Sequence, residues 1–414
     1  MALKKKSTTI DRCRISNSYN LMPILDLGIQ PLANSLKKYG DDSEEKFPLS
    51  VSFCPDSSLL QLNETINKET LFDHYVWVTG TSIATQKYAN EFHSWLVKAA
   101  NPDKKDLIIE IASNDGTFLR PLVENGYSNV LGIDPAKNIA QQANQQGIPT
   151  LPEFWDSSIA EKLLTNRGPA KVIFARNVLP HVSELLDIVQ GIRNLLYKDG
   201  VGIIEFHDAG KIQAELHYDS IYHEHLCYFS IASITCLLSQ FDLIPFHIEQ
   251  SPISGGSWVI FFNKKKQGPS LELERAIASE EKNRVNQLST WQSFANSSIK
   301  HKQDTLEILD SINGKVVVGF GSSARSQTYL NYCEINNSQI TAIVDNNPLK
   351  QGLFTPGSSI PIVDIESGLG LDPDVIFILA WNFREEIVAS CLAAGYKGQF
   401  MLPFPNKLHY FNGK

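Results

Sequence analysis

Hydrophobic and polar positions alternate with two different periods along the chain, and the change of period separates its regions. In residues 1–70 the apolar positions recur every second residue, which is typical of short strands. These runs span residues 23–28, 49–53 and 59–62, with loop-rich sequence between them. Farther on, Tyr88, Phe92 and Trp95 recur on one helix face, so residues 85–98 are predicted to form an amphipathic helix.

Aromatic and polar residues are mixed between these two regions, in residues 71–82. One interpretation is a loop that lines a pocket, with Tyr75 in contact with a substrate. The other is a strand whose aromatic rings pack into the core, and periodicity does not separate the two.

Apolar runs and helical patterns then alternate regularly from residue 106 to residue 262, with predicted helices that include 182–196 and 231–240. Such alternation predicts an α/β fold with a mostly parallel, doubly wound sheet. The predicted strands are 106–112, 129–133, 171–175, 201–205, 243–248 and 257–262. Only residues 249–256 separate the last two strands, so we expect a hairpin that leaves one antiparallel strand at the edge. That arrangement is typical of class I S-adenosylmethionine (SAM) methyltransferases rather than dehydrogenases.

The turn after the first of these strands reads Glu110-Ile-Ala-Ser-Asn-Asp-Gly116 and carries a single glycine. A dinucleotide-binding turn needs G-x-G-x-x-G so that pyrophosphate can approach the helix N-terminus, whereas SAM has no phosphate. We therefore expect SAM to be contacted by Glu110, Asn114, Asp115 and Gly116. Asp134 ends the next strand, where an acid that binds the ribose is expected; a helix N-cap is the alternative.

A second strand–turn–helix pattern follows a polar helical stretch at residues 270–309. Gly319, Gly321 and Ala324 match the G-x-G-x-x-A form of a dinucleotide site, and Asp345 stands where its distal acid belongs. This pattern predicts a second Rossmann-like domain. On its own it also supports an oxidoreductase that uses NAD.

These patterns divide the chain into four parts. A small N-terminal domain is predicted over residues 1–70, the SAM-binding domain over 71–265, a helical connector over 266–310, and a C-terminal Rossmann-like domain over 311–414. A chain of 414 residues is long enough for several domains that each have a core.

Composition and charge narrow the classes of function. Hydrophobic residues make up 43% of the chain and charged residues 20%, as in ordinary globular proteins. The net charge of −8 argues against a general nucleic-acid or membrane-surface binder, and no apolar run approaches the roughly 20 residues of a membrane span. The lysines that follow Met1 do not precede the apolar run of a signal peptide. Six scattered cysteines without paired spacing favour a reducing cytoplasm.

Two short segments have the form of zinc knuckles in which one ligand of each pair is missing. Cys13-Arg-Ile-Ser16 and Cys54-Pro-Asp-Ser57 each have a serine where C-x-x-C would place the second cysteine. A structural zinc site normally has four ligands. Cys13 and Cys54 are therefore predicted to be thiols without a metal, and a partial zinc site is the alternative.

One stretch has an unusual density of groups that can move protons or bind charge: Tyr218-Asp-Ser-Ile-Tyr-His-Glu-His-Leu-Cys-Tyr-Phe-Ser230. Such residues rarely build a core, because each buried polar group needs its own partner. In an extended strand Tyr222 and Glu224 would face away from His225, so an irregular loop is predicted here. A metal bound through the H-x-H spacing is the alternative, although Glu224 would face away from that pair.

The same stretch resembles the D-T-I-Y-H-E-H-x-x-Y-x-S signature of SAM-dependent sugar C-methyltransferases. The best-known members of that family are 3-C-methyltransferases that act on nucleotide-linked 4-keto-deoxysugars. Other motifs follow in the family's order. They are residues 25–34 in its amino-terminal zinc domain, 110–116 for E-I-G-S-N-D-G, 177–182 for N-V-x-A-H-I, and 344–352 with 379–383 in its carboxy-terminal domain. The likeness therefore extends over nearly the whole chain.

The sequence departs from the family's pattern at three places. Ser16 and Ser57 replace zinc-binding cysteines, Ala112 replaces a glycine beside SAM, and residues 254–258 read S-G-G-S-W instead of H-G-G-S-L. The first two changes are expected to be compatible with activity, and the third to affect the choice of substrate.

The resemblance implies a mechanism and roles for individual residues. A base removes the proton next to the ketone of a nucleotide-linked sugar, and the resulting enolate takes the methyl group of SAM. His225 is implied as the base, and Glu224, Tyr222 and His181 as groups that position the sugar or bind the keto oxygen. His223 is expected to make a structural hydrogen bond instead.

Further contacts are expected from Asn177 with SAM, and from Tyr75, Arg325 and Asp345 with the substrate. Two other classes of function stay open on the sequence. One is an NAD-dependent oxidoreductase built on the C-terminal glycines, and the other is a non-catalytic binder of sugar nucleotides.

Overall fold

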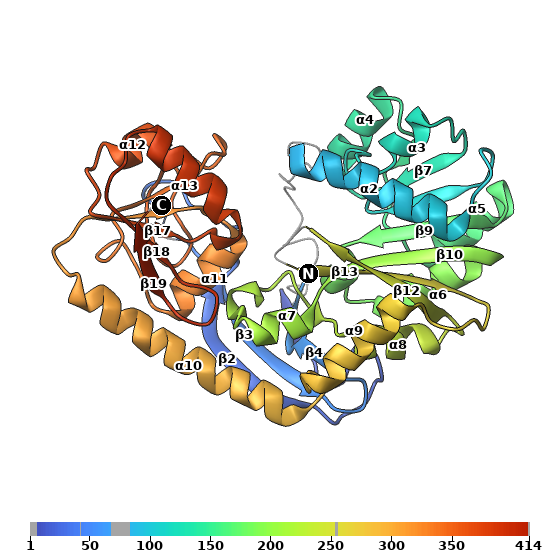
Figure 1. The fold of residues 1–414 in the computed structure, drawn as a ribbon, viewed down its shortest axis with the longest axis horizontal. Helices are drawn as coiled ribbons and strands as arrows, with labels where there is room; N and C mark the ends of the chain where they lie inside the picture. The colour runs from blue at the N-terminus through green and yellow to red at the C-terminus, as the bar shows by residue number, and fades with distance from the viewer. Residues whose placement is uncertain (1–5, 42, 68–82, 253–255, 413–414) are drawn as a thin grey trace, which may run out of the picture.

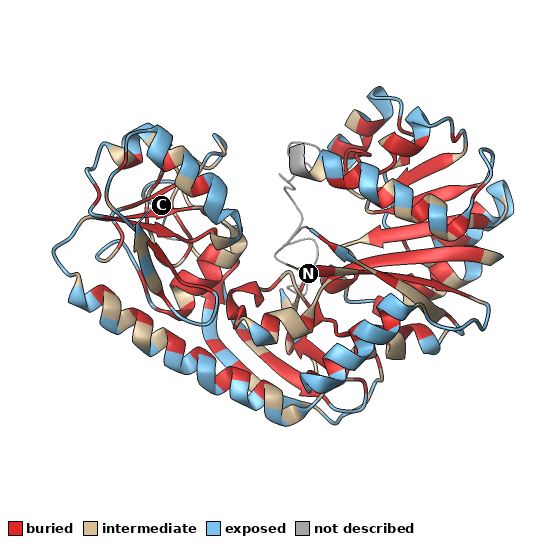
Figure 2. Cartoon of the chain, viewed as in Figure 1, coloured by how far each residue is buried: buried red, intermediate tan, exposed pale blue. Residues whose placement is uncertain are grey.

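A computed structural model of the chain describes residues 6–41, 43–67, 83–252 and 256–412 (Figure 1). Residues 71–82 with Tyr75, for which a pocket-lining loop and a core strand are both open, lie outside the described residues, as do residues 253–255. The described strands belong to four sheets. Buried positions concentrate in the strands and on the inward faces of the helices (Figure 2).

The strands near the N-terminus form an antiparallel sheet that also takes in a strand from far along the chain. Its order is β11-β4-β3-β2, with β2 Met22–Pro31, β3 Lys46–Cys54, β4 Leu59–Leu62 and β11 Cys227–Tyr228. A separate ribbon pairs β1 Ser7–Thr9 with β5 Glu64–Ile66. The three strands predicted here are confirmed. Because β11 lies within the His-rich stretch, that stretch is anchored to the N-terminal sheet.

The central sheet has seven strands in the order β12-β13-β10-β9-β6-β7-β8. They are β6 Ile108–Ile111, β7 Val130–Ile133, β8 Thr150–Leu151, β9 Ala170–Arg176, β10 Leu196–His207, β12 Ile244–Ser251 and β13 Ser257–Asn263. All neighbouring pairs are parallel except those made by β13. This is the class I SAM methyltransferase arrangement, which confirms the predicted fold class.

The predicted position of the antiparallel strand was wrong. The hairpin of β12 and β13 forms as expected, but β13 lies between β10 and β12 and is not the edge strand. The composition of the two strands explains the order. Val259 to Phe262 are apolar at every position and fully buried, as suits a strand covered on both faces. The more polar β12, which is only partly buried, takes the edge.

Helices cover both faces of this sheet and pack on alternate residues of its strands. In β9, Val172 and Phe174 face one core together with Tyr88 and Phe92 of the predicted amphipathic helix, and the intervening residues face the other core. The helices are α2 Ile83–Ala100, α3 Arg120–Glu124, α4 Lys137–Gln145, α5 Ser157–Arg167, α6 Leu185–Leu195, α7 Ala209–Ala214 and α8 Ile231–Ser239. Two single-turn helices, η2 Leu179–His181 and η3 Tyr218–Ser220, follow β9 and α7.

Two helices, α9 Leu271–Lys282 and α10 Leu288–Ser311, lie in the stretch predicted to be helical. The long α10 runs under the N-terminal sheet toward the last sheet (Figure 1), and its Trp291 packs near Phe53 with ring centroids 6.4 Å apart. The last sheet has the order β16-β15-β14-β17-β18-β19.

This last sheet is parallel except for β19 and confirms the second Rossmann-like domain. Its strands are β14 Val317–Phe320, β15 Ala342–Val344, β16 Ile362–Val363, β17 Val375–Ile378, β18 Gln399–Leu402 and β19 His409–Asn412. Its helices are α11 Ala324–Tyr332, α12 Ile365–Leu369, η4 Trp381–Phe383 and α13 Arg384–Ala393.

Candidate active site

The His-rich stretch, residues 218–230, is held on one side by the N-terminal sheet. Cys227 and Tyr228 form β11, which pairs with β4. His223 Nε2 lies 3.2 Å from the carbonyl of Pro48, which confirms the structural hydrogen bond expected for this residue. Glu224 Oε1 accepts a hydrogen bond of 2.6 Å from the Asn34 amide. Residues 223–228 of the stretch are therefore held by residues more than 150 positions earlier in the chain.

Tyr222 and His225 lie side by side at the centre of this stretch. The amide of His225 donates to the carbonyl of Tyr222 at 2.9 Å, a turn that confirms the predicted irregular loop. The turn places the two rings 4.0 Å apart and the Tyr222 hydroxyl 2.7 Å from His225 Nε2. His225 Nδ1 is 3.1 Å from the carbonyl of Ser220. A carbonyl can only accept, so Nδ1 carries the proton and Nε2 has the lone pair that the tyrosine hydroxyl binds.

His181 joins this pair from the central sheet. It ends η2, just beyond the carboxyl end of β9, and its Nδ1 donates to the carbonyl of Glu224 at 2.9 Å. Its ring centroid is 4.7 Å from that of His225. Burial lowers the pKa of His181 to about 4, and burial followed by the nearby His181 lowers the pKa of His225 well below its usual range. Both imidazoles are therefore neutral near pH 7, and each keeps Nε2 as an acceptor.

Two further histidines, His207 and His217, lie close to this group but do not stand out in the sequence. His207 ends β10, and its ring stacks on that of His217 at 6.3 Å. Burial lowers the pKa of His207 to about 3 and that of His217 to about 2. His207 Nε2 makes no hydrogen bond to the described residues; Glu215 lies 3.2 Å from His217 Nε2 without the direction of one. The one available signal was the place of His207 at the carboxyl end of a central strand, where ligands bind.

The turn between β6 and α3 is shaped by three residues in the left-handed region. Ala112, Asn114 and Gly116 have φ of 52°, 51° and 78°. A Cβ on Gly116 would lie 2.7 Å from the Ile148 side chain, so this position requires glycine for both conformation and space. Ala112 instead occupies a conformation that disfavours any side chain. A glycine, which the family has at this position, would adopt this backbone conformation without strain.

Asp134 holds that turn in place. Its two carboxylate oxygens accept hydrogen bonds from the amides of Asn114, at 2.8 Å, and of Ala136, at 2.9 Å. Ala136 is the N-cap residue of α4. Asp134 is therefore not the N-cap of that helix, which is the alternative role that the sequence leaves open for it. Each carboxylate oxygen retains a further lone pair, which fits the hydroxyls of a ribose at the carboxyl edge of the sheet.

The remaining residues predicted to contact SAM surround this turn. Glu110 is buried, its Oε2 makes no hydrogen bond within the described residues, and burial raises its pKa well above the usual range. Asp115 accepts from the Thr117 hydroxyl at 2.7 Å. Asn177, with φ of 50°, follows β9 and donates its amide to the carbonyl of Glu205 at 2.9 Å. The structure thus gathers the predicted residues at one edge of the sheet, which fits a SAM site.

In the C-terminal sheet, an aspartate holds the turn after β14 in the same way as Asp134 holds the turn after β6. Asp345 accepts at 2.8 Å from the amide of Ser322, as Asp134 does from Asn114, and Lys350 lies 3.4 Å from the same oxygen. A Cβ on Gly321 would lie 2.2 Å from Cβ of Ala380. This glycine lets the turn approach Ala380, so the G-x-G-x-x-A match does not depend on a bound pyrophosphate.

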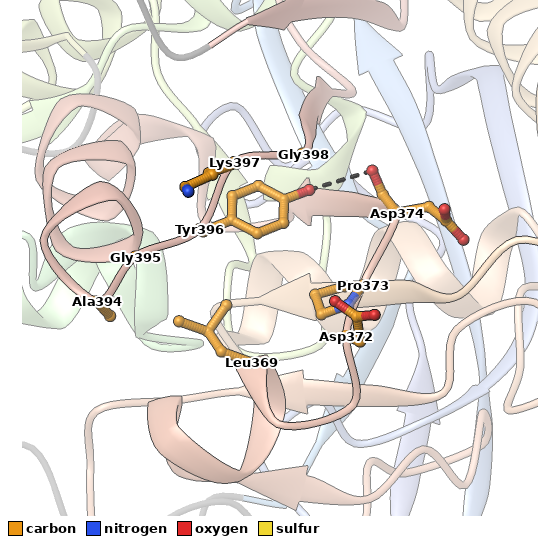
Figure 3. A pocket seen from close by; sticks show the side chains of 9 residues that line it. All are labelled: Leu369, Asp372, Pro373, Asp374, Ala394, Gly395, Tyr396, Lys397 and Gly398. Atoms are coloured by element: carbon orange, nitrogen blue, oxygen red, sulfur yellow. Dashed lines mark hydrogen bonds between the residues drawn. The ribbon is translucent and has the colours of Figure 1, made fainter.

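A surface pocket of about 580 Å³ also lies in this domain, between the segments that precede β17 and β18 (Figure 3). Asp374 and Tyr396 line it, and the tyrosine hydroxyl donates to the carbonyl of Asp374 at 3.3 Å. The pocket is therefore at the amino edge of the sheet. Ligands of doubly wound folds bind at the carboxyl edge, so this pocket is separate from the turn that Asp345 holds.

The degenerate zinc knuckles come together in space. Cys13 Sγ is 3.0 Å from Ser57 Oγ, and Cys54 Sγ is 3.6 Å from Ser16 Oγ. The four positions thus meet as four zinc ligands would, but two of them are hydroxyls, which are not among the usual ligands of structural zinc. Within the described parts of the chain no cluster of three or more histidine, cysteine or acidic residues could hold a metal. The residues present therefore do not fit zinc.

Comparison with known proteins gives matches over most of the chain. Three family models match: “Putative zinc binding domain” at residues 13–72, “Methyltransferase domain” at 85–245 and “C-methyltransferase C-terminal domain” at 252–405. The C-methyltransferase NovU of Streptomyces niveus is 28% identical in an alignment of 405 residues that covers 96% of this chain and 96% of NovU. None of the helices described here has the length and apolar character needed to cross a membrane.

Solved structures match part of the chain. The magnesium protoporphyrin IX methyltransferase of Synechocystis PCC 6803 with bound SAM is 15% identical, with 44% of this chain and 81% of that chain covered and a TM-score of 0.33. The PH0226 protein of Pyrococcus horikoshii OT3 is 14% identical, with 48% of this chain and 100% of that chain covered and a TM-score of 0.38.

Proposed function

Because the chain is a SAM-dependent C-methyltransferase similar to NovU, we propose that its acceptor is a nucleotide-linked keto-deoxysugar, methylated at the carbon next to the ketone. SAM supplies the methyl group on a cationic sulfonium. The observation that carries the proposal is the group of Tyr222, His225 and His181. Two neutral imidazoles and a phenol, with the His225 ring less than 5 Å from each of the other two rings, suit the removal of a proton from carbon.

His225 is the proposed base. Its Nδ1–H is held by the Ser220 carbonyl, so Nε2 is the atom that takes the proton. The Tyr222 hydroxyl lies 2.7 Å from Nε2, and in the proposed reaction it leaves this nitrogen to donate to the keto oxygen. The carbon–hydrogen bond breaks as the nitrogen–hydrogen bond forms, and the electron pair moves onto the ketone as an enolate. The enolate carbon then bonds to the methyl carbon while the sulfur–methyl bond breaks. His225 returns its proton to water.

A base with so low a pKa is weak toward a carbon acid, so the site must stabilise the enolate. The Tyr222 hydroxyl does this at the keto oxygen, and His181 Nε2 orients a sugar hydroxyl by accepting a hydrogen bond from it. Burial raises the pKa of Glu224, and the hydrogen bond from the Asn34 amide partly offsets this rise. The carboxyl group of Glu224 binds a second sugar hydroxyl.

SAM is held at the turn after β6 in this proposal. Asp134 binds the ribose hydroxyls, Glu110 and Asp115 face the methionine end with its amino group, and Asn177 and the backbone around Asn114 and Gly116 complete the site. Asp345 takes the corresponding place for the sugar nucleotide at the C-terminal sheet.

The test uses SAM with a labelled methyl group and a panel of thymidine- and uridine-diphosphate-linked 4-keto-deoxysugars. We expect label in one acceptor, bonded to carbon. His225→Gln should lower kcat by roughly a hundredfold or more, the usual contribution of a general base. The matched control is His247→Gln, because His247 lies on the edge strand β12 and should leave kcat unchanged.

Two results would overturn the proposal. One is transfer of the label to oxygen or nitrogen of the acceptor. The other is stabilisation of the chain by NAD(H), with no stabilisation by S-adenosylhomocysteine, in a thermal-shift titration.

A further inference from the structure

Asp219, at the middle of η3, ties the His-rich stretch to the C-terminal domain. Its side chain is 1% exposed and faces Arg325 of α11. Arg325 donates from Nε at 3.0 Å and from Nη2 at 2.9 Å to the two carboxylate oxygens. Trp381 of η4 donates its indole N–H to the same carboxylate at 2.9 Å. The guanidinium also lies over the Trp381 ring, 4.5 Å from its centroid.

The preceding residue, Tyr218, enters the same domain. It is fully buried, and its hydroxyl lies 2.8 Å from Nδ1 of His301 in α10. Its ring packs against those of Tyr332 at 5.1 Å and Phe404 at 5.3 Å. Both residues at the start of the stretch are thus placed by the C-terminal domain and not by the SAM-binding sheet.

The next residue, Ser220, connects this anchor to the proposed base. Its carbonyl is the group that holds His225 Nδ1 at 3.1 Å. The Ser220 carbonyl and the Asp219 carboxylate belong to neighbouring residues of a single helical turn. A shift of Asp219 therefore moves the acceptor that determines both the position of His225 and the tautomer that leaves Nε2 unprotonated.

A buried ion pair is a poor device for stability, because removing two charges from water offsets much of their attraction. Its better-attested use is to select one arrangement of the groups that it joins. Here the pair joins two domains at a bidentate geometry that lysine could not reproduce. All of the Arg325 contacts described above point to Asp219 and Trp381.

We propose that Arg325 and Trp381 are positioning residues that hold Asp219 and, through the Ser220 carbonyl, place His225 for proton abstraction. The inference rests on the proposed function, because it assumes that His225 is the base. It also changes the role of Arg325, which the sequence assigned to direct contact with the substrate.

The experiment compares Asp219→Asn, Arg325→Gln and the double variant with the unmodified chain, using the acceptor found in the methyl-transfer assay. Each single variant should lower kcat by about ten- to a hundredfold, the loss expected when a reacting group moves by about 1 Å. The KM for the acceptor and the Kd for S-adenosylhomocysteine should stay within about twofold. The double variant should be no slower than the slower single variant, since both changes break one link.

Two further variants separate positioning from a general loss of structure. Trp381→Phe keeps an aromatic ring under Arg325 and removes the donor to Asp219 while the ion pair stays, so its effect on kcat should be smaller. Asp304→Asn breaks an ion pair of 2.9 Å with Lys300 on an exposed face of α10, and should leave kcat unchanged. Variants that retain the Kd for S-adenosylhomocysteine are folded at the SAM site.

The pH profile supplies a readout that a purely structural role would not move. The titratable and charged groups near His225 are His181, His207, Arg325, Tyr222 and Tyr228. Asp219→Asn leaves the charge of Arg325 uncompensated, so the fall of kcat/KM toward low pH should move to still lower pH. Arg325→Gln leaves the Asp219 charge and should move that fall to higher pH.

The outcomes distinguish this inference from the proposed function. If His225→Gln keeps its activity, the base is misassigned and both fail. If His225→Gln is inactive while Asp219→Asn and Arg325→Gln keep full kcat, only the positioning role fails. A rise in acceptor KM confined to Arg325→Gln, with kcat unchanged, would show instead that Arg325 contacts the substrate directly.

Discussion

The structure predicts how the N-terminal domain responds to zinc, because it brings together Cys13, Ser16, Cys54 and Ser57. Zn–S bonds of about 2.3 Å at tetrahedral angles place neighbouring sulfurs about 3.8 Å apart. The two cysteine–serine pairs measure 3.0 Å and 3.6 Å. Within each pair, a sulfur in place of the hydroxyl thus needs to move by less than about 1 Å to reach this spacing. We predict that Ser16→Cys with Ser57→Cys creates a site for one zinc, whereas the unmodified chain has none.

Zinc per chain, measured by elemental analysis after gel filtration, is the direct assay. The double cysteine variant should carry one zinc and lose thermal stability when a chelator is added, and the unmodified chain should do neither. The control is Ser16→Ala with Ser57→Ala, which should bind no zinc. Its free energy of unfolding should fall by about 1 kcal/mol for each hydrogen bond removed. Stoichiometric zinc in the unmodified chain, or a folded double cysteine variant without zinc, would refute the reasoning.

Three further predictions concern the base and the SAM site. Because burial lowers the pKa of His225, kcat/KM should stay level down to pH 6.5 and fall only below it, as Nε2 becomes protonated; a fall centred above the ordinary histidine pKa of about 6.5 would contradict this. Ala112→Gly should raise the free energy of unfolding by roughly 0.5–1 kcal/mol in a denaturant titration, since it relieves a positive φ, whereas Ala140→Gly in helix α4 should lower it by about 1 kcal/mol; equal losses would contradict the strain. Asp134→Asn should weaken S-adenosylhomocysteine binding about tenfold in calorimetry, or about 1.4 kcal/mol, while Asp345→Asn should not; equal effects would place the cofactor elsewhere.

Local patterns were sufficient to predict most of the elements and both large sheets. Strands of period two and helices with apolar stripes depend on neighbours within a few residues, so they can be read from the chain itself. The irregular loop around Tyr222 and His225 followed from the same reasoning, because an extended strand would separate them. The class of the central sheet and the second Rossmann-like domain followed from element order.

Contacts between distant segments could not be predicted in this way. The pairing of β11 with β4 and the link from Asp219 to Arg325 join positions more than a hundred residues apart. The insertion of β13 inside the sheet depends on which strand buries both faces, and a hairpin prediction does not decide that. His207 and His217 become candidate site residues only once the structure shows both rings buried close to His225. A single histidine forms no sequence pattern that would predict this.

The central claim is that the stretch around His225 removes a proton from the carbon next to a ketone. The most direct measurement is the exchange of that hydrogen for deuterium in deuterated water, with S-adenosylhomocysteine bound so that no methyl transfer follows. The unmodified chain should exchange the hydrogen, and His225→Gln should do so at least about a hundredfold more slowly. Equal exchange rates for the two proteins would contradict the assignment of His225 as the base.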